Sequence, residues 1–121
     1  MERINTGLHN FNLINSLNIV EEKFIKCSIS LMNEENYLLI EAIAQLASLH
    51  VRYRKSFKKH AFLLKVIFFK KFTEESINGK IIIKCYRTLS SDKTCVYSAK
   101  AIKDGILLAK GDFMISITDY G

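Results

Sequence analysis

One strongly apolar helical segment limits what this chain can fold into. The run from Tyr37 to His50 contains no Gly, Pro or Asn and is rich in Ala and Leu, the best helix formers. Asn33 suits the N-cap, and Glu34 and Glu35 place negative charge at the positive end of the helix dipole. The helix is apolar on most sides and, at roughly 20 Å, too short to span a bilayer. We therefore expect the remaining chain to wrap around it.

The polar residues of this helix form one narrow line. They are Glu41, Gln45, Ser48 and Arg52, and steps of four, three and four place them on one face. Two interpretations of Glu41 follow from this spacing. The line is either the solvated side of a half-buried helix, or Glu41 is a functional carboxylate held at a cleft.

Length and composition set the class of protein. At 121 residues, 49% of them hydrophobic, the chain is expected to form one domain over residues 1–121. The N-terminus lacks the apolar core of a signal peptide, and no apolar run is long enough to cross a membrane, which together predict a cytoplasmic location. The cysteines Cys27, Cys85 and Cys95 lack metal-ligand spacing, so we expect reduced thiols, no metal and no cofactor.

The net charge is +6, and the basic residues gather in one segment and again at Lys65, Lys70 and Lys71. The segment is that from Arg52 to His60, and it holds five basic side chains, Arg52, Arg54, Lys55, Lys58 and Lys59. Such a cluster favours an acidic partner, either an acidic carrier protein or a phosphate-bearing cofactor. A solvated basic loop is the alternative. No nucleic-acid-binding motif accompanies the charge, so nucleic acid is not expected as a partner.

Alternating hydrophobicity predicts strands on both sides of the helix. Two precede it, one from Phe11 to Ile19 and one over residues 23–31, with a turn at Glu21 and Glu22. Four strands follow it in a predicted meander, at residues 61–69, 80–87, 94–102 and 106–118. The first of these is apolar enough to suggest a central strand. Asp104-Gly105 predicts a two-residue hairpin, and Gly111 a bulge or a close approach.

One antiparallel sheet around one helix is an α+β arrangement that resembles the hotdog fold. The segment from Leu39 to Gln45 is similar to the central-helix motif of β-hydroxyacyl-[acyl-carrier-protein] dehydratases, in which an acidic residue precedes Gln by four positions. The segments from Leu8 to Ile14 and from Asp104 to Met114 resemble that family's opening segment and closing hairpin. Asn12 stands where the family usually has proline.

The resemblance implies a catalytic role for Glu41, but the sequence departs from the family pattern at one place. In the family, a histidine from a His-Phe-Pro-Gly-type loop removes a proton beside the thioester carbonyl, and the helix carboxylate protonates the leaving hydroxyl. Residues 28–36 occupy that place here and contain no His, Pro or Gly. The histidines elsewhere are His9, His50 and His60. By spacing, Cys27 takes the histidine's place, although the alternation puts it inside a strand.

The expected function is therefore binding of an acyl thioester on acyl carrier protein or coenzyme A, with dehydratase chemistry lost. Glu41 is the candidate catalytic residue, Gln45, Ser48 and His60 the candidate substrate-binding residues, and the five basic side chains between Arg52 and Lys59 the candidate carrier site. The resemblance implies a homodimer, or a heterodimer with an active homologue. An active dehydratase, a thioesterase that uses Glu41 to activate water, and a non-enzymatic acyl-binding module remain open as alternatives.

Overall fold

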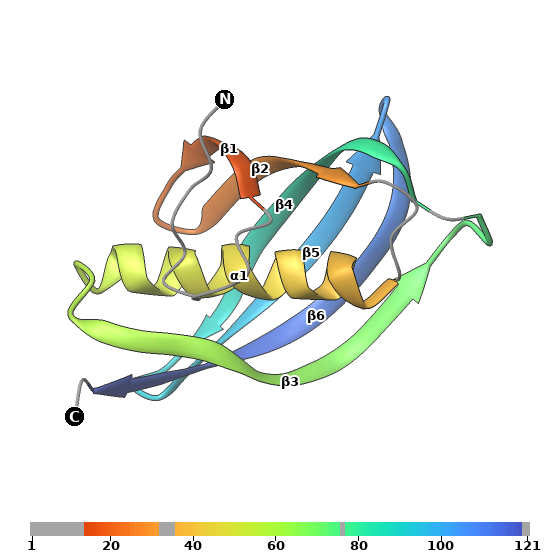
Figure 1. Ribbon diagram of the computed structural model, residues 1–121. Helices are drawn as coiled ribbons and strands as arrows, with labels where there is room; N and C mark the ends of the chain where they lie inside the picture. The colour runs from red at the N-terminus through yellow and green to blue at the C-terminus, as the bar shows by residue number, and fades with distance from the viewer. Residues whose placement is uncertain (1–13, 32–35, 76, 120–121) are drawn as a thin grey trace.

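A computed structural model describes residues 14–31, 36–75 and 77–119 of the chain. They form one helix, α1 (Asn36–Arg54), and six strands. The strands are β1 (Ile14–Val20), β2 (Phe24–Leu31), β3 (Lys59–Lys71), β4 (Gly79–Ser90), β5 (Thr94–Lys103) and β6 (Ile106–Asp119). Figure 1 shows their arrangement. The proposed helix N-cap at Asn33, with Glu34 and Glu35, lies outside the described residues.

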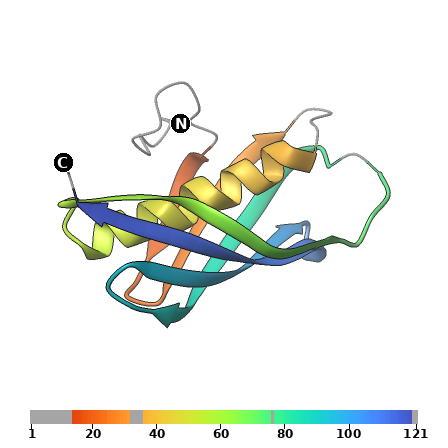
Figure 2. The same ribbon diagram turned by 90° about the horizontal axis from the view of Figure 1, so that it is seen from below.

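All six strands form a single antiparallel sheet in the order β1-β2-β4-β5-β6-β3. The helix lies along one face of this sheet and contacts every strand. Figure 2 shows the sheet curving beneath the helix, with the opposite sheet face left uncovered by any helix or strand of the described chain. The expectation of one antiparallel sheet packed against one helix is confirmed.

The position of β3 corrects two expectations. This strand is not central, and it does not begin a four-stranded meander, because it pairs with β6 and lies at the edge of the sheet. Only β4, β5 and β6 form a meander. The chain crosses from one side of the sheet to the other through α1, since β2 and β3 lie on opposite sides of the helix (Figure 1). The next strand, β4, pairs with β2, and β3 therefore joins the sheet at the other end, beside β6.

The core lies between the helix and the inward-facing residues of the sheet. Leu39, Ile43 and Leu46 on the helix are at most 1% exposed, as a helix surrounded by the sheet requires. Gly111 faces them from β6. A Cβ atom there would lie 2.6 Å from the backbone oxygen of Phe68, which confirms the predicted close approach.

Local turn chemistry agrees with the sequence. Asp104 and Gly105 have φ angles of 50° and 79°, the left-handed values of a two-residue hairpin. The C-terminus of α1 is less expected, since Ser56 and Phe57 also have positive φ, 54° and 58°. The Ser56 N–H donates to the Tyr53 carbonyl, and the Phe57 N–H to that of Arg52. This pair of bonds is the Schellman motif that closes many helices.

Candidate functional site

The polar line on α1 is mostly enclosed. Glu41 is half-buried, whereas Gln45 is fully buried and Ser48 is 5% exposed. The next polar residue, Arg52, is half-buried, and its guanidinium carbon lies 5.7 Å from the centre of the Phe57 ring. Because Gln45 and Ser48 are buried, the line is not the solvated side of the helix. Glu41 is thus a carboxylate at the margin of a buried polar stripe.

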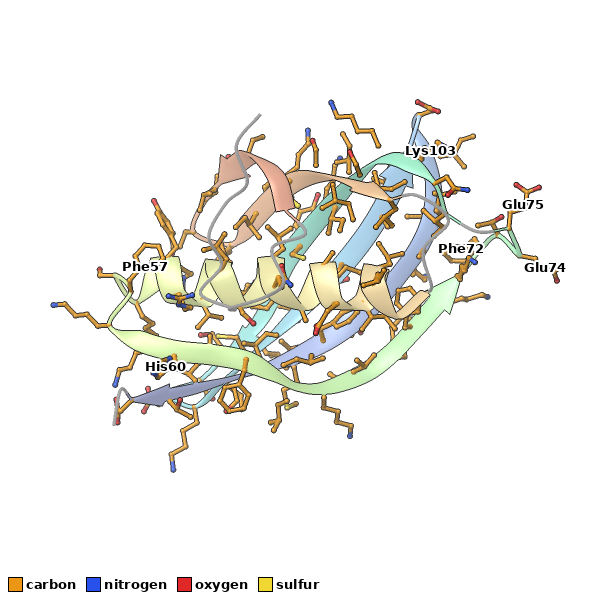
Figure 3. The ribbon with its side chains drawn as sticks, viewed as in Figure 1. Phe57, His60, Phe72, Glu74, Glu75 and Lys103 are labelled. Carbon is orange, nitrogen blue, oxygen red and sulfur yellow. The ribbon has the colours of Figure 1, made fainter. Side chains whose placement is uncertain are left out.

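No imidazole of the described chain accompanies Glu41. Glu41 lies in the second turn of α1, and it forms no hydrogen bond or ion pair with any residue that the structure describes. His60, the second residue of β3, is exposed and lies beside the opposite end of the helix, near Phe57 (Figure 3). The structure therefore does not bring His60 to Glu41. His9 lies outside the described residues.

His50 is occupied by a buried hydrogen-bond network. Its Nε2 atom lies 2.6 Å from the Glu21 carbonyl oxygen, and its Nδ1 atom lies 2.5 Å from the Tyr97 hydroxyl. A carbonyl only accepts, so Nε2 carries the proton and Nδ1 accepts from Tyr97. Burial lowers the pKa of His50, and the charge of Arg54 lowers it further against the opposing bond to Glu21. His50 is thus a neutral link between α1, β5 and the β1–β2 turn.

Cys27 is a core residue. It lies on β2 with no exposed surface, and burial raises the pKa of its thiol to about 12. A thiol with that pKa stays protonated at neutral pH and is a poor nucleophile. Cys85 and Cys95 are also buried, and all three cysteines are free. The described residues contain no cluster of side chains suited to a metal ion.

The basic segment is largely built into regular structure. Arg52 and Arg54 belong to the last turn of α1, where positive charge is favoured by the helix dipole, and Lys59 opens β3 and pairs with Asp119. Lys55 and Lys58 remain in the connection between the two elements. An open surface hollow of about 660 Å³ adjoins this connection, lined by Glu22, Tyr53, Arg54, Ser56 and Phe57.

The comparisons with known proteins identify the fold. No family model matches the chain, and no curated protein matches it in sequence. Solved structures do match. One is the dehydratase heterocomplex ApeI:P from Xenorhabdus doucetiae, with a TM-score of 0.73 and 15% identity over 90% of this chain and 83% of that one. The chain has the hotdog fold.

Two further hotdog structures are those of thioesterases. A mutant thioesterase from Pseudomonas aeruginosa has a TM-score of 0.73 and 9% identity, covering 86% of this chain and 81% of that one. A hypothetical thioesterase from Streptococcus pneumoniae, solved with coenzyme A, has a TM-score of 0.71 and 14% identity, covering 86% and 85%. At these identities the likeness establishes the hotdog architecture alone.

None of the helical residues that the structure describes forms a segment capable of spanning a membrane.

Sequence reasoning missed the partners of His50. Its place on the apolar helix indicated burial, but nothing local pointed to Tyr97, which is 47 residues away, or to Glu21. The only available signal was the inward phase of Tyr97 in the alternation of β5, between the buried residues Cys95 and Ala99. A buried tyrosine hydroxyl requires a partner, and a buried histidine can provide one.

Proposed function

We propose that this hotdog protein binds acyl thioesters, carried on acyl carrier protein or coenzyme A, and that it has lost ordinary dehydratase chemistry. The observation that carries the proposal is Glu41, a half-buried carboxylate on the helix with no described imidazole beside it. Elimination needs one group that starts as a base and another that starts as an acid. Glu41 alone supplies one of these and can orient a substrate hydroxyl.

The proposed setting is fatty-acid or polyketide-type biosynthesis. A partner subunit with its own base would complete the site, and the likeness to a dehydratase heterocomplex supports that arrangement. Under this proposal Gln45 and Ser48 complete the polar lining along α1, and Lys55 and Lys58 belong to the surface that receives an acidic carrier. Pairing with a second copy of the chain is the alternative assembly.

The test is turnover of a crotonyl thioester by the purified protein. We expect little hydration by the protein alone. We expect Glu41→Gln to leave thioester binding almost unchanged, because the amide keeps the shape of the carboxylate and one oxygen that accepts a hydrogen bond from a substrate hydroxyl. Glu22→Gln is a matched control, since the Glu22 side chain is 79% exposed. Rapid hydration that only Glu41→Gln abolishes would refute the loss of dehydratase chemistry.

A thioesterase is the second candidate, favoured by the two thioesterase structures. In that case Glu41 would activate water for attack on the thioester carbonyl. The readout is release of free thiol from a series of acyl-coenzyme A substrates. Thiol release that requires Glu41, without any hydration of the crotonyl thioester, would establish the thioesterase in place of the binding role. If no acyl thioester binds at all, both candidates fail.

A further inference from the structure

Five lysines form a straight row across the outer face of the sheet, the face opposite α1. The strand registers place them directly beside one another: Lys26 opposite Lys84, Lys84 opposite Lys100, Lys100 opposite Lys110, and Lys110 opposite Lys70. The row therefore crosses β2, β4, β5, β6 and β3. With about 4.8 Å between neighbouring strands, it is roughly 19 Å long.

The alternation of burial fixes the side of the sheet on which this lysine row lies. Each central lysine stands between two inward-facing residues with no exposed surface, for example Lys84 between Ile83 and Cys85, and Lys100 between Ala99 and Ala101. Their own side chains consequently project away from the helix. Figure 2 shows that no helix or strand of the described chain covers that face.

Such a row is unfavourable for the isolated chain. Like charges directly opposite one another destabilise an antiparallel sheet. No ion pair in the described part of the chain involves any of the five lysines. One end has partial relief, because the Nζ atoms of Lys70 and Lys110 lie 5.3 and 5.9 Å from the centre of the Phe72 ring, which Figure 3 labels at the end of β3.

The surroundings of the lysine row indicate the shape of an occupant. On one side Ile82 and Ile102 lie opposite each other, both half-buried. They continue the strands that carry Lys84 and Lys100 and point to the same face. On the other side, two residues beyond Lys110, is Asp112. The positive charge is thus one residue wide. It has an aliphatic border on one side, and on the other side Asp112 is followed across the sheet by the uncharged Ser98 and Tyr86.

We propose that the lysine row binds an acidic amphipathic helix of a partner protein. Carboxylates on successive turns of a helix are about 5.4 Å apart, close to the spacing of the lysines, and about three and a half turns cover the row. Apolar side chains beside the acidic stripe would contact Ile82 and Ile102. A membrane surface would call for positive charge over the whole face, and Asp112 disfavours a phosphate backbone.

The test uses two labelled peptides of identical composition and charge. In the first, glutamates recur every three or four residues beside a leucine stripe, and in the second the same residues are shuffled so that no stripe forms. Fluorescence anisotropy at low salt should show the striped peptide binding at least about fivefold more tightly than the shuffled one, since complementary charge geometry governs such contacts.

Matched protein variants locate the binding surface. Replacing Lys84, Lys100 and Lys110 together by Gln should weaken binding of the striped peptide at least about tenfold. The control replaces Lys23, Lys65 and Lys93 by Gln, removes the same charge away from the row, and should weaken binding by less than about twofold. Equal losses in both variants would overturn the proposal, as would equal binding of the two peptides or no binding of either.

The single substitution Lys100→Gln checks the premise without a ligand. Lys100 has a lysine on each side, so its replacement should raise the denaturation midpoint, and the gain should shrink as salt rises. Tighter binding of a single-stranded DNA oligonucleotide, or of phosphatidylserine vesicles, than of the striped peptide would exclude the helical partner. None of these measurements uses a thioester. Failure of the peptide-binding proposal therefore leaves the proposed acyl-thioester function untouched, and failure of that function leaves the peptide-binding measurements valid.

Discussion

The Nδ1 atom of His50 lies 2.5 Å from the hydroxyl oxygen of Tyr97, inside the core. This contact joins the last turns of α1 to β5, and the Glu21 carbonyl extends it to the β1–β2 turn. All of the polar capacity of the imidazole is used, since one nitrogen donates and the other accepts. In this fold His50 is therefore a structural connection between helix and sheet.

Removing the Tyr97 hydroxyl should destabilise the protein measurably. In Tyr97→Phe the His50 Nδ1 atom keeps its burial but loses its donor, which costs about 1–3 kcal/mol of unfolding free energy. Urea denaturation at pH 7.5 measures the loss. Tyr86→Phe is the matched control, because Tyr86 is 41% exposed and its hydroxyl can bond to water. Equal effects of the two substitutions would contradict the network.

Acid should weaken the fold through the same histidine. The pKa of His50 is lowered from its ordinary value of 6.5 by burial, so the unfolded chain binds a proton at a higher pH than the folded one. Stability from His50 is thus complete above pH 6.5 and is lost as the pH falls below that value toward the folded pKa. We expect His50→Gln to be less stable at pH 7.5 and to show a flatter stability profile between pH 6.5 and 5. An unchanged profile would contradict this prediction.

The left-handed C-cap of α1 offers a stabilising substitution. Ser56 has φ 54°, a conformation that costs a residue with a side chain about 1–2 kcal/mol and glycine almost nothing. After the greater flexibility of glycine in the unfolded chain is subtracted, Ser56→Gly should stabilise by about 0.5–1 kcal/mol. Ser56→Ala is the control, since alanine carries the same strain. Thermal denaturation showing no difference between them would argue against the cap.

The free edge of β3 should control assembly. Leu64 and Ile67 are 54% and 44% exposed on an edge strand whose outer backbone groups have no neighbouring strand in the described chain. We expect pairing there with a second subunit. In sedimentation at micromolar concentration, Leu64→Lys with Ile67→Lys should shift the protein to monomer. Leu89→Lys, at a 68% exposed site on β4, should not. A monomeric wild-type protein would refute self-association.

The connection after α1 should respond to charge reversal if it receives an acidic carrier. Lys55→Glu with Lys58→Glu spares Arg52 and Arg54, whose charges favour the helix end. We expect about tenfold weaker binding of acyl carrier protein and a flatter dependence on salt. Reversal of Lys23 and Lys93, which lie elsewhere, is the control. Unchanged binding would make the segment a solvated connection.

The sequence by itself determined the elements and their inward faces. Helix propensity and a surface that is apolar on most sides predicted a helix from Tyr37 that includes Arg52, and α1 runs from Asn36 to Arg54, because both properties are local. The alternating hydrophobicity of residues 23–31 correctly predicted β2, whose apolar residues Ile25, Cys27, Ile29 and Leu31 are buried. Asp104-Gly105 fixed one hairpin, because its backbone preference depends on those two residues alone.

Only the tertiary structure decided which strands are neighbours. An apolar strand has the same sequence pattern whether it lies at the centre or at the unpaired edge of a sheet. The predicted central position of β3 is therefore wrong. The local sequence pattern does not determine strand register either. The residues around Lys84 do not show that Lys26 and Lys100 lie opposite it. Likewise, the residues around His50 do not show that it contacts Tyr97. These contacts join residues 16 to 58 positions apart, and their energies depend on the fold that brings them together.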